Sequence, residues 1–427
     1  MYPNLYFFLK ETLGIEPWSV TRYIHSFGFF VAISFVLAAV TLAKELKRRE
    51  KQGLLHPKEE MITVGKPASI TELALNFIFG FIIGYKLLGI FLAGQNLSPQ
   101  DYIFSTSGSW PGGIILGLVF SGLRFWEKNK QKLPKPEERK IRIWPHERVG
   151  DITIYAAIFG FIGAKVFDNL ENWDRFVENP VGNLLSPSGL TFYGGLICAA
   201  AFILYYARRK SISLLHLVDS AAAPLMLAYA VGRIGCQVSG DGDWGIFNSA
   251  YQVDSAGKIV PAVAEQFKSI VISNGDYAKY LVSEFGSLDN IPHTYFKGLS
   301  FLPNWFWAYN YPHNVNEVGT AIAGCSDSYC RQLNPPVFPT PLYETIVCLV
   351  LFAALWWLRK RLKIAGQLFA VYLVLNGVER FFVEKIRVNS TYNLFGFHPT
   401  QAELISSLLV ISGLIMFFYL RKNNKTA

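Results

Sequence analysis

Charged side chains are scarce in this chain of 427 residues: Asp, Glu, Lys and Arg make up 17% of it, whereas soluble domains carry about 25%. Hydrophobic residues make up 51%, and aromatic residues alone 15%. The composition is too apolar for a disordered chain, and no heptad period, internal repeat or low-complexity tract is visible. Disordered, fibrous and solenoid architectures are therefore excluded, and a lipid solvent is indicated.

The chain contains long apolar runs with few charged residues. A helix needs about 20 residues to cross a hydrocarbon layer of about 30 Å, and such runs recur along the chain. The first 23 residues lack a basic region, so we expect no cleavable signal peptide. The sequence predicts an all-α, polytopic integral membrane protein with about nine transmembrane helices. The expected spans are 24–42, 73–93, 112–126, 152–168, 190–206, 216–234, 341–358, 365–383 and 403–420.

Two loops between the expected spans contain almost no Lys or Arg. Residues 94–111 contain none and residues 168–189 contain only Arg175. Five other segments, 43–72, 124–150, 207–215, 359–364 and 421–427, hold 26 of the 40 basic residues. Basic loops remain in the cytoplasm, so we expect the N-terminus outside and the C-terminus inside. The net charge of +9 is then a topology signal, and no nucleic-acid partner is expected.

One outside loop, residues 246–337, is long, polar and rich in Tyr, Asn, Pro and Gly. We expect it to form a small extracytoplasmic subdomain inserted in a single transmembrane domain spanning 1–427, with a helix over 261–272 and little strand. Cys325 and Cys330 lie in this loop, where an oxidising compartment favours a disulfide. Free thiols, or a metal site that adds two histidines, are the alternatives, and no metal is expected.

Charge inside a membrane span costs about 2.5–3.5 kcal/mol, so its position points to function. Lys86 and Lys165 lie near span ends, where long side chains reach the interface. Arg233, Arg380 and two glutamates, Glu344 and Glu403, fall at the outer ends of spans six to nine. Two interpretations remain open: a structural lattice of ion pairs, or a phosphate site, because the planar guanidinium matches two phosphate oxygens.

Four segments surround these charges: LTFYGGL (190–196), GRIGCQVSGDGDWG (232–245), PVFPTPLYE (336–344) and NGVERFFVEKIR (376–387). In this order they resemble the bacterial prolipoprotein diacylglyceryl transferases, whose patterns read H-G-G-L, G-R-x-G-N-x-x-N-x-E, H-P-x-Q-L-Y-E and R-F-x-x-E-x-x-R. Relative to that family, residues 73–126 look like an additional hairpin of two spans.

The resemblance implies a transferase of the bacterial inner membrane that moves the diacylglyceryl group of phosphatidylglycerol to the lipobox cysteine of prolipoproteins, without a cofactor. The lipid bilayer and the signal peptide of the prolipoprotein would be its partners. The implied catalytic residues are Arg233, Arg380, Tyr193 and Glu344. The implied substrate-binding residues are Arg233, Asp241, Tyr343, Gly194, Gly195 and Glu403.

The chain departs from the family patterns within the site itself. Tyr193 replaces the histidine proposed as general base, and Asp241 replaces the glutamate. Cys236 and Ser239 replace the two asparagines, while Phe338 and Pro341 replace the histidine and glutamine. His398, in HPTQAEL (398–404), is an alternative base. Two other functions are therefore kept: a related transferase with a different acceptor, and a phospholipid-binding or transporting membrane protein without catalysis.

Overall fold

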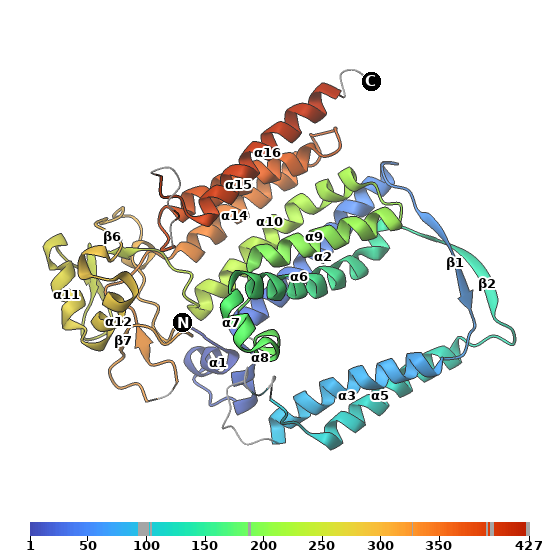
Figure 1. Ribbon diagram of the computed structural model, residues 1–427, viewed down its shortest axis with the longest axis horizontal. Coiled ribbons are helices and arrows are strands. Elements are labelled where there is room, and N and C mark those ends of the chain that lie inside the picture. Colours follow the sequence, from blue (N-terminus) through green and yellow to red (C-terminus); the bar gives the residue numbers. More distant parts are fainter. Residues whose placement is uncertain are drawn as a thin grey trace. The chain divides into compact units, whose positions relative to one another are not determined.

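The computed structural model describes residues 1–92, 102, 105–186, 189–326, 328–389, 392 and 397–423. The chain divides into two compact units. The first contains residues 1–42 and 215–427, and the second contains residues 43–214. Helices dominate both units, and the strands are short (Figure 1).

Each of the nine expected spans falls on a long helix in the described part of the chain. Six of these helices, α2, α3, α6, α10, α14 and α16, are long and apolar enough to cross a membrane. The protein is therefore an all-α polytopic membrane protein, as predicted, and nine crossings remain a prediction. The helices are α2 (Ser26–Lys51), α3 (Ile70–Leu92), α5 (Trp110–Lys130), α6 (Val149–Glu171), α9 (Phe192–Arg209), α10 (Leu214–Ser239), α14 (Thr340–Leu358), α15 (Gln367–Glu384) and α16 (Gln401–Asn423).

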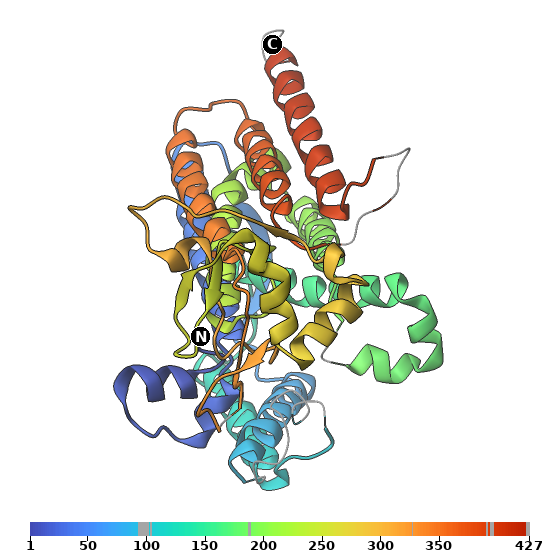
Figure 2. The ribbon, with the colours of Figure 1, turned by 90° about the vertical axis from the view of Figure 1, so that its left-hand side faces the viewer.

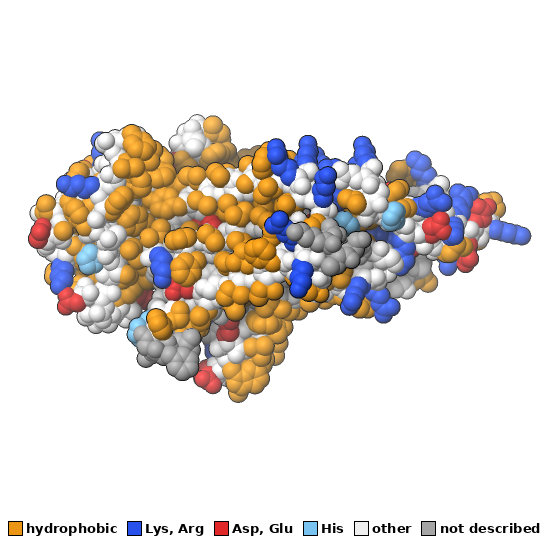
Figure 3. Space-filling view, turned by 90° about the horizontal axis from the view of Figure 1, so that it is seen from above, with side chains coloured by type: hydrophobic (Ala, Val, Ile, Leu, Met, Phe, Trp, Pro, Cys, Tyr) orange, Lys and Arg blue, Asp and Glu red, His pale blue; other side chains and the backbone are white. Residues whose placement is uncertain are grey.

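Large apolar side chains point outward from these helices. Leu118 on α5 is 61% exposed, Phe161 on α6 54% and Leu408 on α16 65%. On the face drawn in Figure 3, hydrophobic side chains form broad continuous patches between groups of Lys and Arg. Exposed apolar area on this scale is unfavourable in water by about 25 cal/mol per Å², so these surfaces fit a lipid environment.

In the second unit, glycines allow two helix pairs to approach closely. A Cβ on Gly84 of α3 would lie 2.2 Å from the carbonyl oxygen of Gly112 on α5. A Cβ on Gly163 of α6 would lie 2.5 Å from the carbonyl oxygen of Gly194 on α9. Small residues at helix contacts are typical of membrane proteins. Lys86 donates to three backbone oxygens of residues 102–107, which is a structural role.

The basic segments on either side of α3 and α5 contain an element that the sequence analysis did not predict. Strands β1 (Lys58–Val64) and β2 (Glu137–Ile143) pair antiparallel, with Lys58 opposite Ile143. The remaining elements of this unit are η2 (Pro145–Arg148), α7 (Trp173–Glu178) and α8 (Pro180–Leu185).

In the first unit, α14, α15 and α16 run alongside one another (Figures 1 and 2). Helices α10, α14 and α15 share a core that includes Ala222, Met226, Cys348 and Leu368. Two short elements, α1 (Leu5–Leu13) and η1 (Ser19–Tyr23), precede α2. The bundle is thus packed by apolar side chains up to the ends of its helices, where the charges gather.

Residues 246–337 fold as a small subdomain with their own core, built around Phe267, Val271, Ile291 and Leu333. The helix expected over 261–272 begins later, as α11. In the described part of the loop the strands have only two or three residues, as expected. The elements are β3 (Phe247–Asn248), β4 (Tyr251–Val253), β5 (Ile259–Pro261), η3 (Ala264–Gln266), α11 (Phe267–Ser273), α12 (Asp276–Phe285), η4 (Leu288–Asn290), β6 (His293–Thr294), α13 (Asn304–Trp307), β7 (Thr320–Ala321) and β8 (Arg331–Gln332).

The subdomain is joined to the end of α10. The Tyr311 hydroxyl donates to Oε1 of Gln237 at 2.8 Å, and the Val315 amide donates to the Ser239 carbonyl at 3.0 Å. Within the subdomain, Cys325 and Cys330 form a disulfide with Cα atoms 5.6 Å apart.

Candidate functional site

A cluster of buried charges lies where α10, α14 and α15 meet the subdomain. Glu344, in the first turns of α14, is its centre, and its side chain has no exposed surface. Oε2 of Glu344 pairs with Nε of Arg233 and accepts from the Tyr229 hydroxyl at 2.9 Å. Oε1 accepts from Nη1 of Arg387 at 3.2 Å, while Nη1 of Arg380 lies 3.6 Å away. Three arginines therefore converge on one carboxylate, and we call these residues with Asp243 the arginine cluster.

Asp243 is the second carboxylate of the cluster. One of its oxygens pairs with Nη1 of Arg233 and the other with Nη2 of Arg387. Burial raises the pKa of Asp243, but the attraction of the two guanidinium groups is stronger and holds this pKa at about 2. Asp243 is therefore ionised at neutral pH and holds two arginines in fixed positions.

The segment GDGDWG (240–245) brings the carboxylate of Asp243 to the helix ends. Gly240 and Gly242 have φ values of +65° and +95°, a region that residues with a Cβ rarely adopt. The chain then crosses the ends of α14 and α15. The Thr340 hydroxyl donates to the Asp243 carbonyl at 2.7 Å, and the Ile246 amide donates to the Ile386 carbonyl at 2.9 Å.

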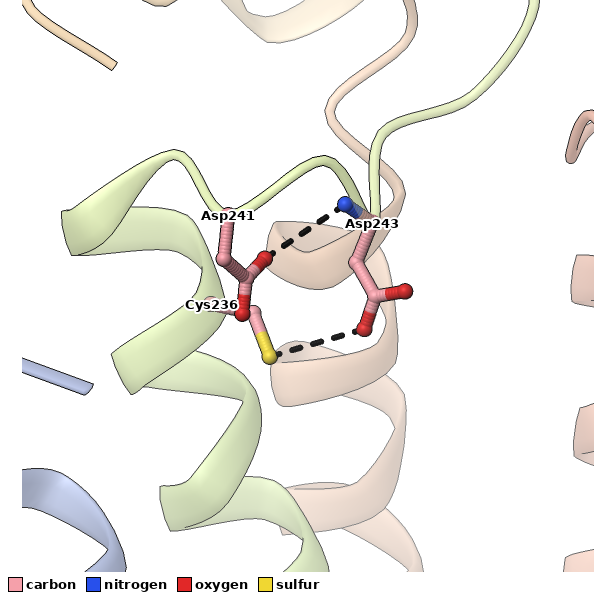
Figure 4. A group of neighbouring side chains, drawn as sticks. All are labelled: Cys236, Asp241 and Asp243. Atoms are coloured by element: carbon pink, nitrogen blue, oxygen red, sulfur yellow. Dashed lines mark hydrogen bonds between the residues drawn. The ribbon is translucent and has the colours of Figure 1, made fainter. Parts of the chain in front are cut away.

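Cys236, Asp241 and Asp243 form a group with metal-ligand atoms (Figure 4). The Cys236 thiol lies 3.6 Å from Oδ2 of Asp243, whose amide is 3.4 Å from Oδ1 of Asp241. Burial and the nearby Asp243 raise the pKa of Asp241. Because Asp243 is already neutralised by two arginines, a cation here would face two positive charges, and the arrangement favours an anion site over a metal site.

Some buried polar atoms beside the cluster have no hydrogen-bond partner among the described residues. They are both carboxylate oxygens of Glu379, Nη1 of Arg380 and Oε2 of Glu384. Glu379 is only 6% exposed. Buried polar groups are normally hydrogen-bonded, so these atoms match a ligand that offers both an acceptor for the arginine and donors for the carboxylate.

Several residues implied by the resemblance lie outside the arginine cluster. The Tyr343 hydroxyl donates to the Phe306 carbonyl at 2.5 Å, in the subdomain. Glu403 pairs with the half-exposed Lys385 at 2.5 Å and caps α16, accepting from the Thr400 amide at 3.1 Å. Among the described residues Asp241 makes no ion pair or hydrogen bond with an arginine, whereas Asp243 pairs with Arg233 and Arg387.

Tyr193, Gly194 and Gly195 belong to the second unit, at the start of α9. Tyr193 is partly exposed and its ring contacts that of Phe192, with centroids 5.7 Å apart. Gly194 and Gly195 are buried against α6, where a Cβ on Gly195 would lie 2.8 Å from the Gly160 carbonyl oxygen. In the structure these glycines allow close packing of α6 and α9. His398 is exposed on the segment before α16.

Sequence reasoning did not assign a role to five residues of this region: Tyr229, Asp243, Glu379, Glu384 and Arg387. Arg380, Glu384 and Arg387 occur at i, i+4 and i+7, a spacing that places them on one helical face. Nη2 of Arg380 indeed lies 3.1 Å from Oε2 of Glu384. Tyr229 precedes Arg233 by one helical turn, and the Arg233 guanidinium lies 5.3 Å from its ring.

The fold and this site define a polytopic membrane protein in which three arginines and two carboxylates are paired at one end of α10, α14 and α15. The sequence profile of the family described as "Prolipoprotein diacylglyceryl transferase" matches residues 113–419. The chain belongs to this family, and the resemblance seen in the motifs is confirmed.

Curated relatives carry the name phosphatidylglycerol–prolipoprotein diacylglyceryl transferase. The protein of Shouchella clausii is 23% identical over 333 residues, which are 77% of this chain and 92% of the relative. The protein of Dehalococcoides mccartyi is 25% identical over 292 residues, 66% of this chain and 84% of the relative. That of Leptospira interrogans is 26% identical over 278 residues, 60% and 66% respectively. The chain is thus a divergent member.

Proposed function

We propose that the protein transfers the diacylglyceryl group of phosphatidylglycerol to the lipobox cysteine of prolipoproteins, in the bacterial inner membrane with its N-terminus outside. One observation carries the proposal beyond family membership: the buried Arg380 Nη1 and Glu379 carboxylate lack hydrogen-bond partners among the described residues. A phosphatidylglycerol headgroup offers phosphate oxygens to the arginine and glycerol hydroxyls to the carboxylate.

The reaction forms one bond and breaks one bond. The cysteine sulfur attacks the glyceryl carbon next to the phosphate ester, a C–S bond forms, and the C–O bond to phosphate breaks. The thiol proton passes to a base, and glycerol phosphate leaves with the electron pair of the broken bond. A thiol with a pKa of about 8.5 is already a few per cent thiolate at neutral pH, so the greater demand falls on the leaving phosphate.

The arginine cluster meets this demand by its position. Negative charge grows on the leaving phosphate in the transition state, and fixed cations in a site of low dielectric stabilise that charge most strongly. Arg233 and Arg380 are the proposed catalytic cations. Glu344 and Asp243 keep the guanidinium groups oriented before the substrate binds, which limits the reorganisation needed during the reaction.

The site residues named from the resemblance have different roles in the proposal. Glu344 acts on the arginines rather than on the lipid. Tyr193 and His398 remain proposed sources of the base. Tyr343 and Asp241 are proposed to line the path of the lipid headgroup at the outer end of the bundle.

Complementation tests this proposal directly. The chain is expressed in bacteria depleted of their own diacylglyceryl transferase, and a reporter prolipoprotein is examined by mass spectrometry. We expect the diacylglyceryl thioether on the reporter. Reporter protein with an Ala in place of the lipobox cysteine is the matched control. An unmodified reporter, despite normal levels of the chain in the membrane, contradicts the proposal.

A further inference from the structure

The subdomain presents a strongly aromatic segment, residues 295–307, which we call the aromatic loop. Six of its 13 residues are Phe, Tyr or Trp, and it contains one Lys and no acidic residue. Its large side chains are exposed: Phe301 by 76%, Leu299 by 52% and Trp305 by 48%. Neighbouring exposed apolar side chains of this size mark an interaction surface.

The aromatic loop is held in a fixed shape. Asn248, which is completely buried, donates from Nδ2 to the carbonyl oxygens of Phe296 at 2.9 Å and Trp307 at 3.1 Å. Between these two points Gly298 has a φ of +73°, and a Cβ there would lie 2.1 Å from the Trp307 ring. The backbone therefore holds the exposed rings outward instead of letting them collapse onto the subdomain core.

The aromatic loop is continuous with the lipid-facing surface of the bundle. Tyr343, in the first turn of α14, donates to the Phe306 carbonyl at 2.5 Å, and the two rings have centroids 5.3 Å apart. Since α14 is long and apolar enough to cross a membrane, its first turn lies at a membrane interface. Trp and Tyr are enriched at this level, with their rings among the lipid headgroups.

The distribution of charge also favours a phospholipid surface as the partner of the aromatic loop. The part of the subdomain before the aromatic loop, residues 246–294, carries five acidic and three basic residues. Within the loop, Lys297 is the sole charged residue, with its Nζ 6.0 Å from the centre of the Tyr295 ring. A basic group among aromatic rings suits a membrane surface that contains anionic phospholipid.

We propose that the aromatic loop inserts Leu299, Phe301 and Trp305 into the leaflet at the N-terminal end of α14, so that phospholipid is the partner of this surface. The inference depends on α14 crossing the membrane, and it does not depend on transferase activity. The subdomain is then anchored to the bilayer beside the arginine cluster instead of projecting freely into water.

Photocrosslinking in a bilayer tests the inference. The full chain, with p-benzoylphenylalanine in place of Phe301, is reconstituted in vesicles of phosphatidylglycerol and radiolabelled phosphatidylethanolamine, then irradiated. Phosphatidylethanolamine is labelled because it is not the lipid of the proposed reaction. The matched control carries the same amino acid in place of Tyr280, which lies on α12 of the subdomain and is 48% exposed.

Interfacial insertion predicts about tenfold more labelled lipid on the chain modified at position 301 than on the control, because only rings at the interface meet lipid continuously. The same substitution at Trp305 gives a second position and should behave like 301. Equal labelling at 301, 305 and 280 would overturn the inference. A crosslinked product of twice the chain mass, without labelled lipid, would overturn it in favour of a second copy of the chain.

Discussion

Arg233 and Glu344 form an ion pair inside the helical bundle, joining the end of α10 to the start of α14. The Glu344 side chain has no exposed surface and that of Arg233 has 15%. A guanidinium buried to this degree requires a carboxylate beside it, because an unpaired buried charge is strongly destabilising. The pair therefore compensates the buried guanidinium and fixes its position.

Removing the charge of Glu344 should destabilise the protein strongly. Glu344→Gln leaves Arg233 and Arg387 less compensated, and breaking a buried pair costs about 3–5 kcal/mol. Glu403→Gln serves as the control, since its partner Lys385 is half exposed and such pairs contribute about 0–1 kcal/mol. Thermal melting in detergent should show a much lower midpoint for the first variant than for the second. Equal midpoints would mean that Glu344 does not hold the cluster together.

Acid should weaken the cluster through Asp243. Its pKa is about 2 in the folded protein, below the ordinary value of 3.8. A lowered pKa stabilises the folded state at pH above the ordinary value, and this stabilisation is lost as pH falls from 3.8 toward 2. The melting midpoint in detergent should therefore fall as the pH falls across that window. Asp243→Asn should flatten this part of the profile, whereas Asp254→Asn, outside the cluster, should not. Identical profiles for all three proteins would contradict the assignment.

Substitution of Glu379 should weaken binding of the lipid without lowering the stability of the fold. Glu379→Gln keeps the size of the side chain but replaces a buried carboxyl group that has no hydrogen-bond partner among the described residues. If Glu379 bonds the headgroup glycerol, KM for phosphatidylglycerol should rise about 3- to 10-fold, the value of one ordinary hydrogen bond. The melting midpoint should stay or rise. An unchanged KM with a lower midpoint would give Glu379 a structural role.

The proposed orientation can be tested with two cysteines. Ser107 and Gln131 are exposed residues just beyond the opposite ends of α5. In a background with Cys198→Ala, Ser107→Cys should react with a membrane-impermeant maleimide in intact spheroplasts, and Gln131→Cys should react only after lysis. The reason is the concentration of basic residues on the Gln131 side. Reversed labelling would contradict the proposed orientation.

The sequence predicted helices well because each expected span is a continuous apolar run. It did not predict β1 and β2, whose residues are mostly exposed and so show no alternation of apolar and polar side chains. Their pairing depends on contacts between chain segments far apart in sequence, such as Lys140 with Glu59 at 2.5 Å.

In the site, motif positions predicted Arg233, Arg380 and Glu344 as neighbours, and the structure places both arginines on that glutamate. The sequence could not choose between Asp241 and Asp243, because two left-handed glycines decide which carboxylate turns toward the arginines. Nor could it tell that Tyr229, and not Tyr343, donates to Glu344. That choice depends on the rotation of each helix within the bundle.

The central claim is that Arg233 and Arg380 bind the leaving phosphate. The decisive measurement is release of glycerol phosphate from phosphatidylglycerol in the presence of a lipobox peptide, with a melting curve for each variant. Arg233→Lys and Arg380→Lys keep the charge but lose the planar fork, so turnover should fall by about two to three orders of magnitude while folding survives. Arg331→Lys, in the subdomain, should leave turnover unchanged. Full turnover in both cluster variants would contradict the account and leave the arginines as a structural lattice.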